Sequence, residues 1–550
     1  MNLRALLLAP LMLFSACAPI TAQQGQYTIS GTVMSAATGQ PLDRADVSLL
    51  TADTSQSDGQ GQLIAETTTN ADGRFLFAHL AAAKYSLRAD RRGYLAAAYD
   101  EHEDFSTAIV TGEGLPSDGL VFRLAPHAVI GGTVADDSGD PVSQARISLY
   151  RQNTRNGLGN IVRVSSTTAD DTGAYEFARL EPGNYFLAVS ATPWYATQWQ
   201  PRLDTQGNPA PDTTHAPLDV AYPTTFYSDV TDQDAATPIP VKAGDKAQIN
   251  FALHAVPAVH LSFRIPTAPG QPVSMPQVQQ EVFGITDNSP MQSMYRIGAR
   301  QNGGTMTAET SGVAPGHYEV SLNSPGGASS RGSGIDITGD ATFDTSQMEA
   351  RADISGKVAM ANGEKLPEHV SIALQGSDGQ TPAEERVDPD GSFNLHGVPP
   401  ASYQVHVNSN RLLSIARITA SGATVEGHTL KVGSQPIILA ATLVEGSTTI
   451  RGFAKQGGKP SAGVMVLLAP KHPISSTELI RRDQSASDGS FELRQVVPGN
   501  YTLVAVADGW ALDWAKPEVL APYLAKGQPV TVAPNARTIP LKDPIEVQAK

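Results

Sequence analysis

Cysteine and charged residues are scarce in this chain of 550 residues. A single cysteine excludes a disulfide framework, a cysteine-ligated zinc site and an iron–sulfur cluster. Charged residues make up 17%, and 39 Lys and Arg stand against 54 Asp and Glu, which gives a net charge of −15. Nucleic acids and anionic lipids reward clustered positive charge, so no nucleic acid partner is expected.

Long apolar runs are also missing beyond the N-terminus. No later segment of about 18 apolar residues could span a membrane, so membrane contact is expected only through an N-terminal anchor. Hydrophobic residues are nevertheless 41% of the chain, enough to bury cores, and 49 Gly with 39 Pro indicate many turns.

Catalytic motifs are lacking as well. None of the twelve histidines begins a His-x-x-Glu, and there is no Gly-x-Ser-x-Gly, no P-loop and no Gly-x-Gly-x-x-Gly after a strand. The acids of Asp388–Gly391 are too few for the six to eight oxygens of calcium and are better explained as a turn. We predict no catalytic residue, no metal and no cofactor, and therefore no enzyme.

The N-terminus predicts export. Residues 1–24 combine one positive charge at Arg4, about ten apolar residues and a small-residue exit, as in a signal peptide. The segment ending in Cys17 resembles a lipobox, in which the cysteine is lipidated, although Phe14 replaces the usual leucine. Cleavage after Ala22 would instead discard Cys17. The protein is expected in the periplasm or as an outer-membrane lipoprotein, or secreted.

The remaining chain repeats. Four segments open with an apolar-x-Gly-x-apolar strand, centred on Gly31, Gly132, Gly356 and Gly452. In each, a second alternating strand, a Gly-containing turn, an aromatic strand and a tyrosine strand follow. The turn glycine precedes the tyrosine by twelve residues in all four copies: Gly73 and Tyr85, Gly173 and Tyr185, Gly391 and Tyr403, Gly489 and Tyr501. Fixed spacing is typical of a short two-strand unit, because loops tolerate changes of length.

A fifth, degenerate unit lies between the second and third copies. It keeps the Pro-Gly-x-Tyr strand around Tyr318, but Met306 replaces the turn glycine. We therefore predict domains at 25–126, 127–256, 257–350, 351–446 and 447–550, the third degenerate. Short alternating strands between turns predict an all-β protein: a tandem array of about five Ig-like or transthyretin-like antiparallel β-sandwich domains after the signal peptide.

The openings and turns resemble the carboxypeptidase regulatory-like domain, a transthyretin-like sandwich related to starch-binding-like folds. The resemblance covers nearly all of 27–550 and is weakest over 258–350. It includes a resemblance to such domains in large exported bacterial proteins. In the namesake peptidases this domain accompanies a separate zinc catalytic domain, so the resemblance implies no activity.

Aromatic side chains recur after the repeat tyrosine. Nine residues after it lie Tyr94, Trp194 and Trp510, and thirteen or fourteen after it lie Tyr99, Trp199 and Trp514. Exposed rings could stack on sugar faces, whereas a ring just after a strand often closes a core. We expect the first position mostly in the core and the second on the surface. Tyr99, Trp199 and Trp514 are therefore the carbohydrate-binding candidates.

Two polar features receive structural interpretations. The acidic run Asp100–Asp104 is expected to be a solvated edge that discourages aggregation. His254 and His260, near the second junction, are expected to pack or face solvent rather than bind metal.

These observations favour a non-catalytic exported envelope protein, a rod of sandwiches that acts as a structural or binding module. One alternative is a carbohydrate-binding protein that uses the aromatic pairs. Another is an accessory subunit of an envelope hydrolase or uptake receptor. The expected partners are accordingly a polysaccharide or an envelope protein.

Overall fold

The computed structural model describes residues 25–52, 61–153, 157, 159–196, 218–266, 276–287, 298–302, 305–323, 330–376, 381, 383–411, 413–471, 479–533 and 536–550. Strands are by far the commonest regular element in these residues, as predicted. Five hydrophobic cores follow one another along the chain, within 29–124, 128–253, 259–337, 352–443 and 450–547. We call the corresponding parts of the chain units one to five.

Unit one has two facing sheets, ordered β4-β1-β8 and β3-β2-β5-β6, with β7 also on β5. Its strands are β1 (Tyr27–Ser35), β2 (Asp46–Thr51), β3 (Leu63–Thr68), β4 (Arg74–Leu80), β5 (Lys84–Asp90), β6 (Ala97–Ala98), β7 (Ile109–Val110) and β8 (Leu120–Leu124).

Unit two repeats this plan with sheets β12-β9-β17 and β11-β10-β13-β15; β18 also pairs with β9, and β16 with β13. Its elements are β9 (Ala128–Asp136), β10 (Arg146–Asn153), β11 (Asn160–Thr168), β12 (Ala174–Leu180), β13 (Gly183–Ser190), β14 (Val220–Ala221), β15 (Thr225–Phe226), η1 (Gln233–Ala235), β16 (Ile239–Val241), β17 (Lys246–Gln248), β18 (Phe251–Leu253) and β19 (Val256–Pro257).

Unit three, the degenerate one, is also a sandwich, with sheets β23-β24-β20-β27 and β22-β21-β25-β26-β28. Its elements are β20 (Val259–Pro266), β21 (Pro276–Val282), β22 (Ile285–Asp287), β23 (Gly298–Asn302), β24 (Thr305–Val313), β25 (Gly316–Asn323), β26 (Ser330–Ile337), β27 (Ala341–Asp344), η3 (Thr345–Gln347) and β28 (Glu349–Ala350).

Unit four has sheets β32-β29-β37-β34 and β31-β30-β33-β36-β35. Its strands are β29 (Ala352–Met360), β30 (Ser371–Gly376), β31 (Ala383–Arg386), β32 (Ser392–Val398), β33 (Ala401–Asn408), β34 (Leu413–Ser421), β35 (Thr424–Glu426), β36 (Thr429–Val432) and β37 (Ile437–Glu445).

In unit five β46 pairs with both β38 and β43, so the two layers join into one sheet of nine strands. Its elements are β38 (Thr448–Gln456), β39 (Lys459–Pro460), β40 (Met465–Pro470), β41 (Arg481–Gln484), β42 (Ser490–Val496), β43 (Gly499–Val506), η5 (Gly509–Ala511), α1 (Pro517–Leu524), β44 (Gln528–Val532), β45 (Thr538–Pro540) and β46 (Ile545–Gln548). Helix α1 was not predicted; Pro517 at its first turn favours the start of a helix.

Most strand pairs are antiparallel, but the opening strand of every unit pairs in parallel with a late strand of the same unit. These pairs are β1 with β8, β9 with β17, β20 with β27, β29 with β37 and β38 with β45. Glycine occupies the opening position because the backbone of the parallel partner strand comes too close to leave room for a Cβ. A Cβ on Gly356 would lie 2.0 Å from the carbonyl oxygen of Leu439 and 2.7 Å from the Phe393 ring.

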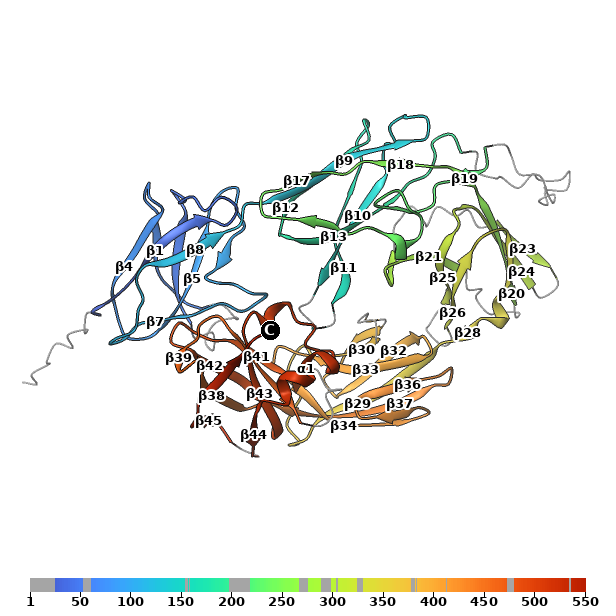
Figure 1. The fold of residues 1–550 in the computed structure, drawn as a ribbon. Coiled ribbons are helices and arrows are strands. Elements are labelled where there is room, and N and C mark those ends of the chain that lie inside the picture. Colours follow the sequence, from blue (N-terminus) through green and yellow to red (C-terminus); the bar gives the residue numbers. More distant parts are fainter. Residues whose placement is uncertain are drawn as a thin grey trace, which may run out of the picture.

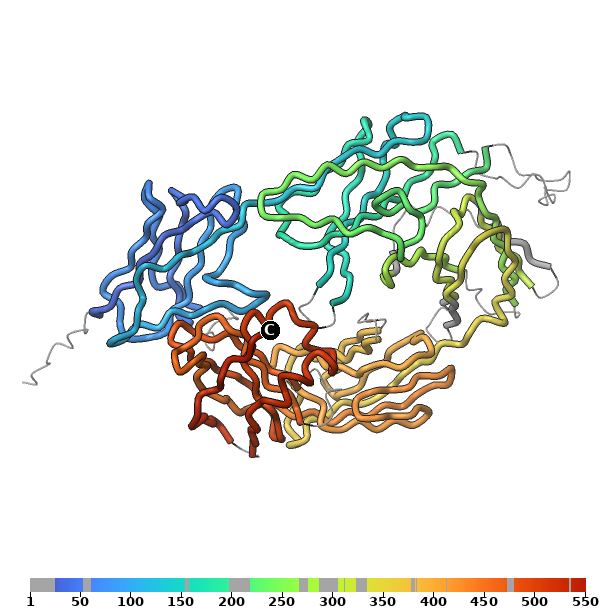
Figure 2. The backbone as a smooth tube through the Cα atoms, in the orientation of Figure 1, coloured from blue at the N-terminus to red at the C-terminus, as the bar shows by residue number. Residues whose placement is uncertain are grey.

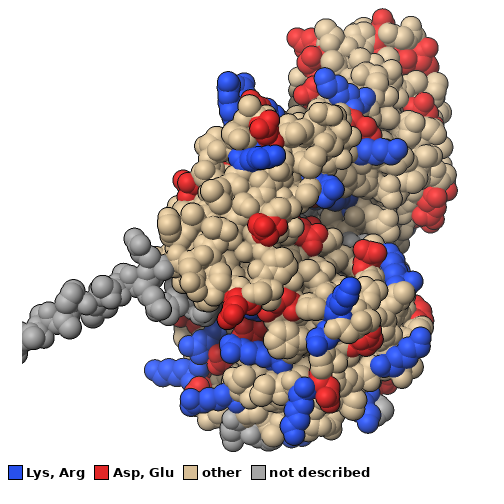
Figure 3. Space-filling model, turned by 60° about the vertical axis from the view of Figure 1, so that its left-hand side comes forward, with Lys and Arg blue, Asp and Glu red and all other residues tan. Residues whose placement is uncertain are grey.

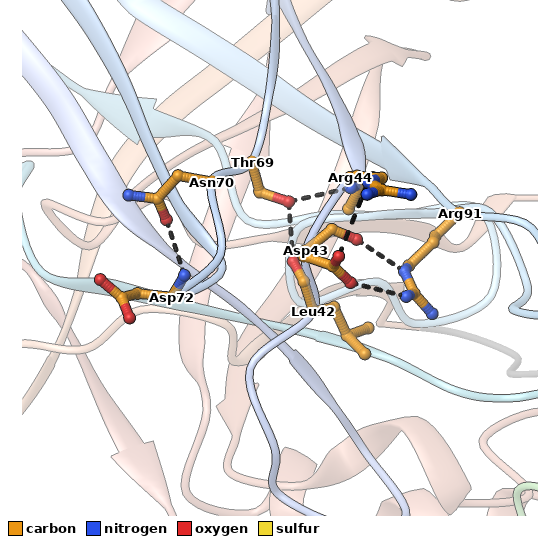
Figure 4. Close-up of polar contacts among 8 residues, drawn as sticks. Leu42, Asp43, Arg44, Thr69, Asn70, Asp72 and Arg91 are labelled. Atoms are coloured by element: carbon orange, nitrogen blue, oxygen red, sulfur yellow. Dashed lines mark hydrogen bonds and ion pairs between the residues drawn. The ribbon is translucent and has the colours of Figure 1, made fainter.

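The repeat turns have the geometry that the sequence predicts. Gly73, Gly173, Gly391 and Gly489 all have positive φ, a region that side chains with a Cβ rarely adopt. A side-chain oxygen closes each turn from within. In unit one Asn70 Oδ1 accepts a hydrogen bond from the backbone nitrogen of Asp72 at 3.0 Å (Figure 4). In the neighbouring loop Thr69 donates to the Leu42 carbonyl oxygen, and Asp43 pairs with Arg91.

The repeat tyrosine makes the same hydrogen bond in all five units. Its hydroxyl donates to the carbonyl oxygen four residues earlier, at distances from 2.7 to 3.1 Å, from Tyr85, Tyr185, Tyr318, Tyr403 and Tyr501. Unit three has therefore lost the turn glycine but kept this bond.

The five units form a closed ring, with units one and five side by side and units two, three and four completing the circuit (Figures 1 and 2). The predicted rod is therefore wrong. A rod needs junctions that leave successive units in line, whereas the units here turn until the last one lies beside the first.

The junction between units two and three shows such contacts. The Phe283 ring lies 5.2 to 5.4 Å from the rings of Tyr150, Phe186 and Phe226. His260 Nε2 lies 2.7 Å from Oδ2 of buried Asp219, so this histidine packs at the junction, as expected.

Candidate functional site: the closure between units one and five

The closure joins a loop of unit one to the side of unit five. The loop runs from β6 to β7 and contains the acidic run Asp100–Asp104. It lies against β41 and η5, whose residues come from near the other end of the chain (Figure 1). We call residues 100–108 the closure loop.

A nearly buried ion pair lies at the centre of the closure. Arg482 Nη2 is 2.8 Å from Glu103 Oε2, and the two side chains are 11% and 10% exposed. The Arg482 guanidinium also lies 4.4 Å from the Trp514 ring centroid and 5.3 Å from that of Phe105. Aromatic faces attract a cation most strongly where water is excluded, so this arginine is held by charge and by ring faces together.

Aromatic rings from the two units stack beside this pair. His102 is parallel to Trp510, with centroids 5.5 Å apart and an interplanar angle of 11°. Phe105 lies 5.2 Å from the same tryptophan. Trp510 Nε1 in turn donates to the carbonyl oxygen of Gly463 at 3.2 Å, which fixes the ring that receives the loop.

Gln484 makes side-chain hydrogen bonds to the closure loop. Its Nε2 donates to the Asp100 carbonyl oxygen at 2.6 Å and to Thr107 Oγ1 at 2.8 Å, and its Oε1 lies 3.2 Å from His102 Nδ1. Thr107 itself donates to Asp100 Oδ2 at 2.7 Å. A single buried amide thus satisfies three groups of the closure loop, which makes the contact specific in register.

Backbone pairing extends the closure at the repeat turn of unit five. The Ser487 nitrogen donates to the Ala108 carbonyl oxygen, and Ser487 Oγ accepts from the Val110 nitrogen, both at 2.8 Å. The turn that the sequence identifies by Gly489 therefore also contacts the neighbouring unit.

Unit two contributes a third contact. Between β10 and β11, the Gly157 carbonyl oxygen accepts a hydrogen bond from the Ala515 nitrogen at 3.0 Å. A Cβ on Gly157 would lie 2.6 Å from the Trp514 ring. Gly157, which lies between the two strands, therefore reaches unit five.

Asp483, which follows Arg482 in the chain, has a buried carboxyl group whose charged form is destabilised. Its oxygens accept hydrogen bonds from the backbone nitrogens of Gln484 and Glu492, at 2.8 and 2.6 Å. Burial nevertheless raises the pKa of Asp483 to about 6, because the charged form loses water, while the positive charge of Lys84 in unit one acts in the opposite direction.

The predicted aromatic candidates differ in their exposure to solvent. Trp514 is only 7% exposed, so the expectation of a surface ring there is wrong; Arg482 and the Gly157 segment cover it. Tyr99 is half-buried against Phe122, with centroids 5.6 Å apart. Trp199 lies outside the described residues, as does the lipidation candidate Cys17.

The first aromatic position is not uniform either. Trp510 is 7% exposed, as expected of a core ring, whereas Trp194 is 83% exposed and contradicts that expectation. The shared offset from the repeat tyrosine therefore does not give a shared environment, because Trp510 packs with β40, β43 and α1 of unit five and against rings of the closure loop.

The acidic run is solvated only in part, which corrects the prediction made for it. Asp100, Glu101 and Asp104 are exposed, whereas Glu103 is paired and nearly buried and His102 is stacked. The functional residues that sequence reasoning missed are Arg482, Gln484 and Phe105. Their signal was weak: a basic pair, Arg481-Arg482, in one repeat and an acidic run in another.

No group of three or more His, Cys, Asp or Glu suited to a metal ion occurs among the residues that the structure describes. Within the same residues, no helix has the length and apolar character needed to cross a membrane.

Two family models match the chain. The carboxypeptidase regulatory-like domain matches residues 28–111 and 129–254, in units one and two. The second β-sandwich domain of the BOS complex subunit NOMO1-like family matches residues 444–522, mostly in unit five. The chain is a tandem β-sandwich protein, and its units one and two match the carboxypeptidase regulatory-like domain. No curated protein matches it.

Solved structures with some likeness include two pilins and one further bacterial protein. The Bacillus anthracis TIE protein is 10% identical over 76% of this chain and 74% of its own, with a TM-score of 0.17. The minor pilin GBS52 of Streptococcus agalactiae is 15% identical over 45% of this chain and 100% of its own, at 0.22. A streptococcal ancillary pilin is 10% identical over 58% and 99%, at 0.19. These scores are too low to bear on the architecture or role of this tandem sandwich protein.

Proposed function

We propose that this protein is a non-catalytic, exported scaffold of the bacterial cell envelope, in which five sandwiches hold one another in a ring and present binding surfaces. The observation that carries the proposal is the closure, because its buried ion pair, stacked rings and Gln484 bonds join parts of the chain nearly 400 residues apart. Such a specific contact favours a scaffold of defined shape over a flexible spacer.

Small-angle scattering of residues 25–550 tests the scaffold. The ring should give a pair-distance distribution that ends at a short maximum distance, and Arg482→Glu, which places two carboxylates together, should lengthen it. An unchanged, extended distribution for both proteins would contradict the proposal.

Export is tested separately through the N-terminus. If Cys17 is acylated, Cys17→Ser should move the protein from the membrane pellet to the soluble fraction, because a lipid chain is then the only anchor. An N-terminal sequence that begins at Gln23 in the wild-type protein would exclude lipidation and leave secretion.

Carbohydrate binding is a second candidate, favoured by one observation. Trp194 is 83% exposed and adjoins the Tyr195 ring, with centroids 5.7 Å apart. Affinity electrophoresis in gels containing soluble polysaccharides should show retardation that Trp194→Ala abolishes and buried-ring Trp510→Phe does not. Equal mobility of the wild type and Trp194→Ala with every polysaccharide would remove this candidate.

A further inference from the structure

Trp194 lies at the end of unit two where β9 ends and β10 begins. β13 ends there at Ser190, which pairs with Arg146 at the start of β10, and Trp194 follows four residues later. Its side chain is 83% exposed, and its ring meets the Tyr195 ring edge to face, with centroids 5.7 Å apart and an interplanar angle of 88°. Rings in edge-to-face contact enclose no space between them, so the pair offers one open indole face.

A turn with three aspartates lies at the same end of unit two. β9 ends at Asp136, whose buried carboxylate accepts hydrogen bonds from the backbone nitrogens of Ser138 and Asp140, both at 2.9 Å. Asp137 and Asp140 are exposed, and neither forms an ion pair with any residue that the structure describes. The turn therefore presents two unpaired carboxylates to solvent.

A pair of tyrosines connects this turn with the tryptophan. The side chains of Tyr195 and Tyr222 share a hydrogen bond. Burial raises the pKa of Tyr222, and this hydrogen bond and the negative charges of Asp136 and Asp137 act in the same direction. The phenol of Tyr222 thus lies within the field of these aspartates, so the rings of Trp194 and Tyr195 lie beside the acidic turn.

The charge of this end is negative overall. The repeat turn adds Asp170 and Asp171 to the three aspartates of the first turn, because β12, which follows it, pairs with the last part of β9. The basic residue of these strand ends, Arg146, is half-buried and has contacts of its own. Even with a protonated His254 after β18, two cations face five carboxylates. A ligand with positive charge would complement this surface.

The fold does not require this combination, as the equivalent positions of two other units show. The turn after the opening strand has no charged residue in unit one, at 36–40, and contains Lys459 in unit five. The equivalent ring is half-buried Tyr94 in unit one, with the Arg91 guanidinium 5.3 Å from its centroid, and buried Trp510 in unit five. Of these three units, unit two alone joins an exposed ring to an acidic turn.

We propose that this end of unit two binds a cationic polysaccharide, whose amino sugars stack on Trp194 and place ammonium groups on Asp137 and Asp140. An amino sugar carries both complementary features on one ring, an apolar C–H face and a positive charge. A lysine-rich peptide shares the charge but lacks a flat face to cover the open indole. The inference rests on the carbohydrate candidate proposed above and names its class of ligand.

Calorimetric titration with two hexasaccharides tests the charge. The β-1,4-linked hexamer of glucosamine and its N-acetylated counterpart share a backbone, but at about pH 5.5 only the first is cationic, while aspartates stay ionised. Residues 25–550 should bind the glucosamine hexamer at least tenfold more tightly. Asp137→Asn/Asp140→Asn should remove this preference, whereas Glu364→Gln/Glu368→Gln, which neutralises two exposed acids between β29 and β30 of unit four, should not. Equal effects of the two double variants would overturn the proposal.

Replacement of the ring tests the stacking. Trp194→Ala should abolish binding of the glucosamine hexamer, and Trp194→Phe, which keeps an aromatic face, should retain part of it. Equal affinity of the wild type for both hexamers would refute the amino-sugar specificity and leave the carbohydrate candidate standing. Binding of neither hexamer would overturn the inference, and tighter binding of hexalysine would assign the site to a basic polypeptide instead. None of these outcomes affects the ring, which scattering tests separately.

Discussion

At the residue scale, Arg482 is the group on which the closure depends. Its charge is compensated by Glu103, and its planar guanidinium lies over aromatic faces of both units. Lysine could not reproduce this arrangement, because its compact ammonium lacks a face to stack.

Arg482→Met should open the closure. Methionine keeps much of the apolar contact but leaves Glu103 buried without its cation, which costs about 3–5 kcal/mol in buried pairs. Tryptophan fluorescence should shift to longer wavelength as Trp510 and Trp514 meet water. The double variant Arg482→Met/Glu103→Gln removes both charges, so it should recover much of the lost stability of the closure. If it recovers none, packing rather than charge dominates the contact.

Asp483 should make unit five less stable as the pH rises. The pKa of Asp483 is raised by burial to about 6, above its ordinary value, so the folded state holds the proton more tightly than the unfolded state. Its stabilising contribution is complete below about pH 4 and is lost as the pH rises to about 7, by at most about 3 kcal/mol. Urea unfolding at several pH values measures this, and Asp483→Asn should flatten the slope. An equal slope in both proteins would assign the pH dependence to other groups.

At the element scale, the repeat turn could be predicted well from the sequence, because its requirements are local. Gly391 has positive φ, as expected, and the twelve-residue spacing leads to a tyrosine that bonds within its own turn. The aromatic offset predicted less, because Trp510 and Trp514 pack in a second core of unit five, on β40, β43 and α1, and the closure loop of unit one packs against this core. Charge complementarity between distant loops leaves no spacing pattern in a sequence.

Two glycines of unit four separate backbone strain from steric collision. Both have positive φ, but a Cβ on Gly391 would lie 2.3 Å from the Val358 carbonyl oxygen, whereas a Cβ on Gly363 would meet nothing within 4 Å. We expect Gly363→Ala to destabilise the unit by about 1 kcal/mol and Gly391→Ala by about 3 kcal/mol. Thermal melts of both variants measure the difference, and equal losses would mean that the turn can relax around the added methyl.

At the scale of the whole molecule, the ring couples units that the order of the chain separates. Tandem sandwiches with independent cores would melt one by one. Because units one and five share buried contacts, we expect them to unfold in one calorimetric transition in the wild type and in two transitions in Arg482→Met. Two separate transitions already in the wild type would show that the closure contributes little to stability.

The number of units and their strands could be predicted from the repeats, while the ring could not. The second junction illustrates the reason: Phe283 enters an aromatic cluster from another unit, and nothing in its own repeat distinguishes it from a surface residue. Hydrophobic periodicity reports which residues leave water, not which neighbour covers them.

The closure also determines how the molecule would bear mechanical load. In a rod, tension between the first and last units passes through every domain in series. In this ring the same tension acts first on the contact of Arg482 with Glu103 and on the stacked rings of His102 and Trp510, in parallel with the three intervening sandwiches. The closure would therefore yield before any core unfolds and would release a length of folded chain as slack.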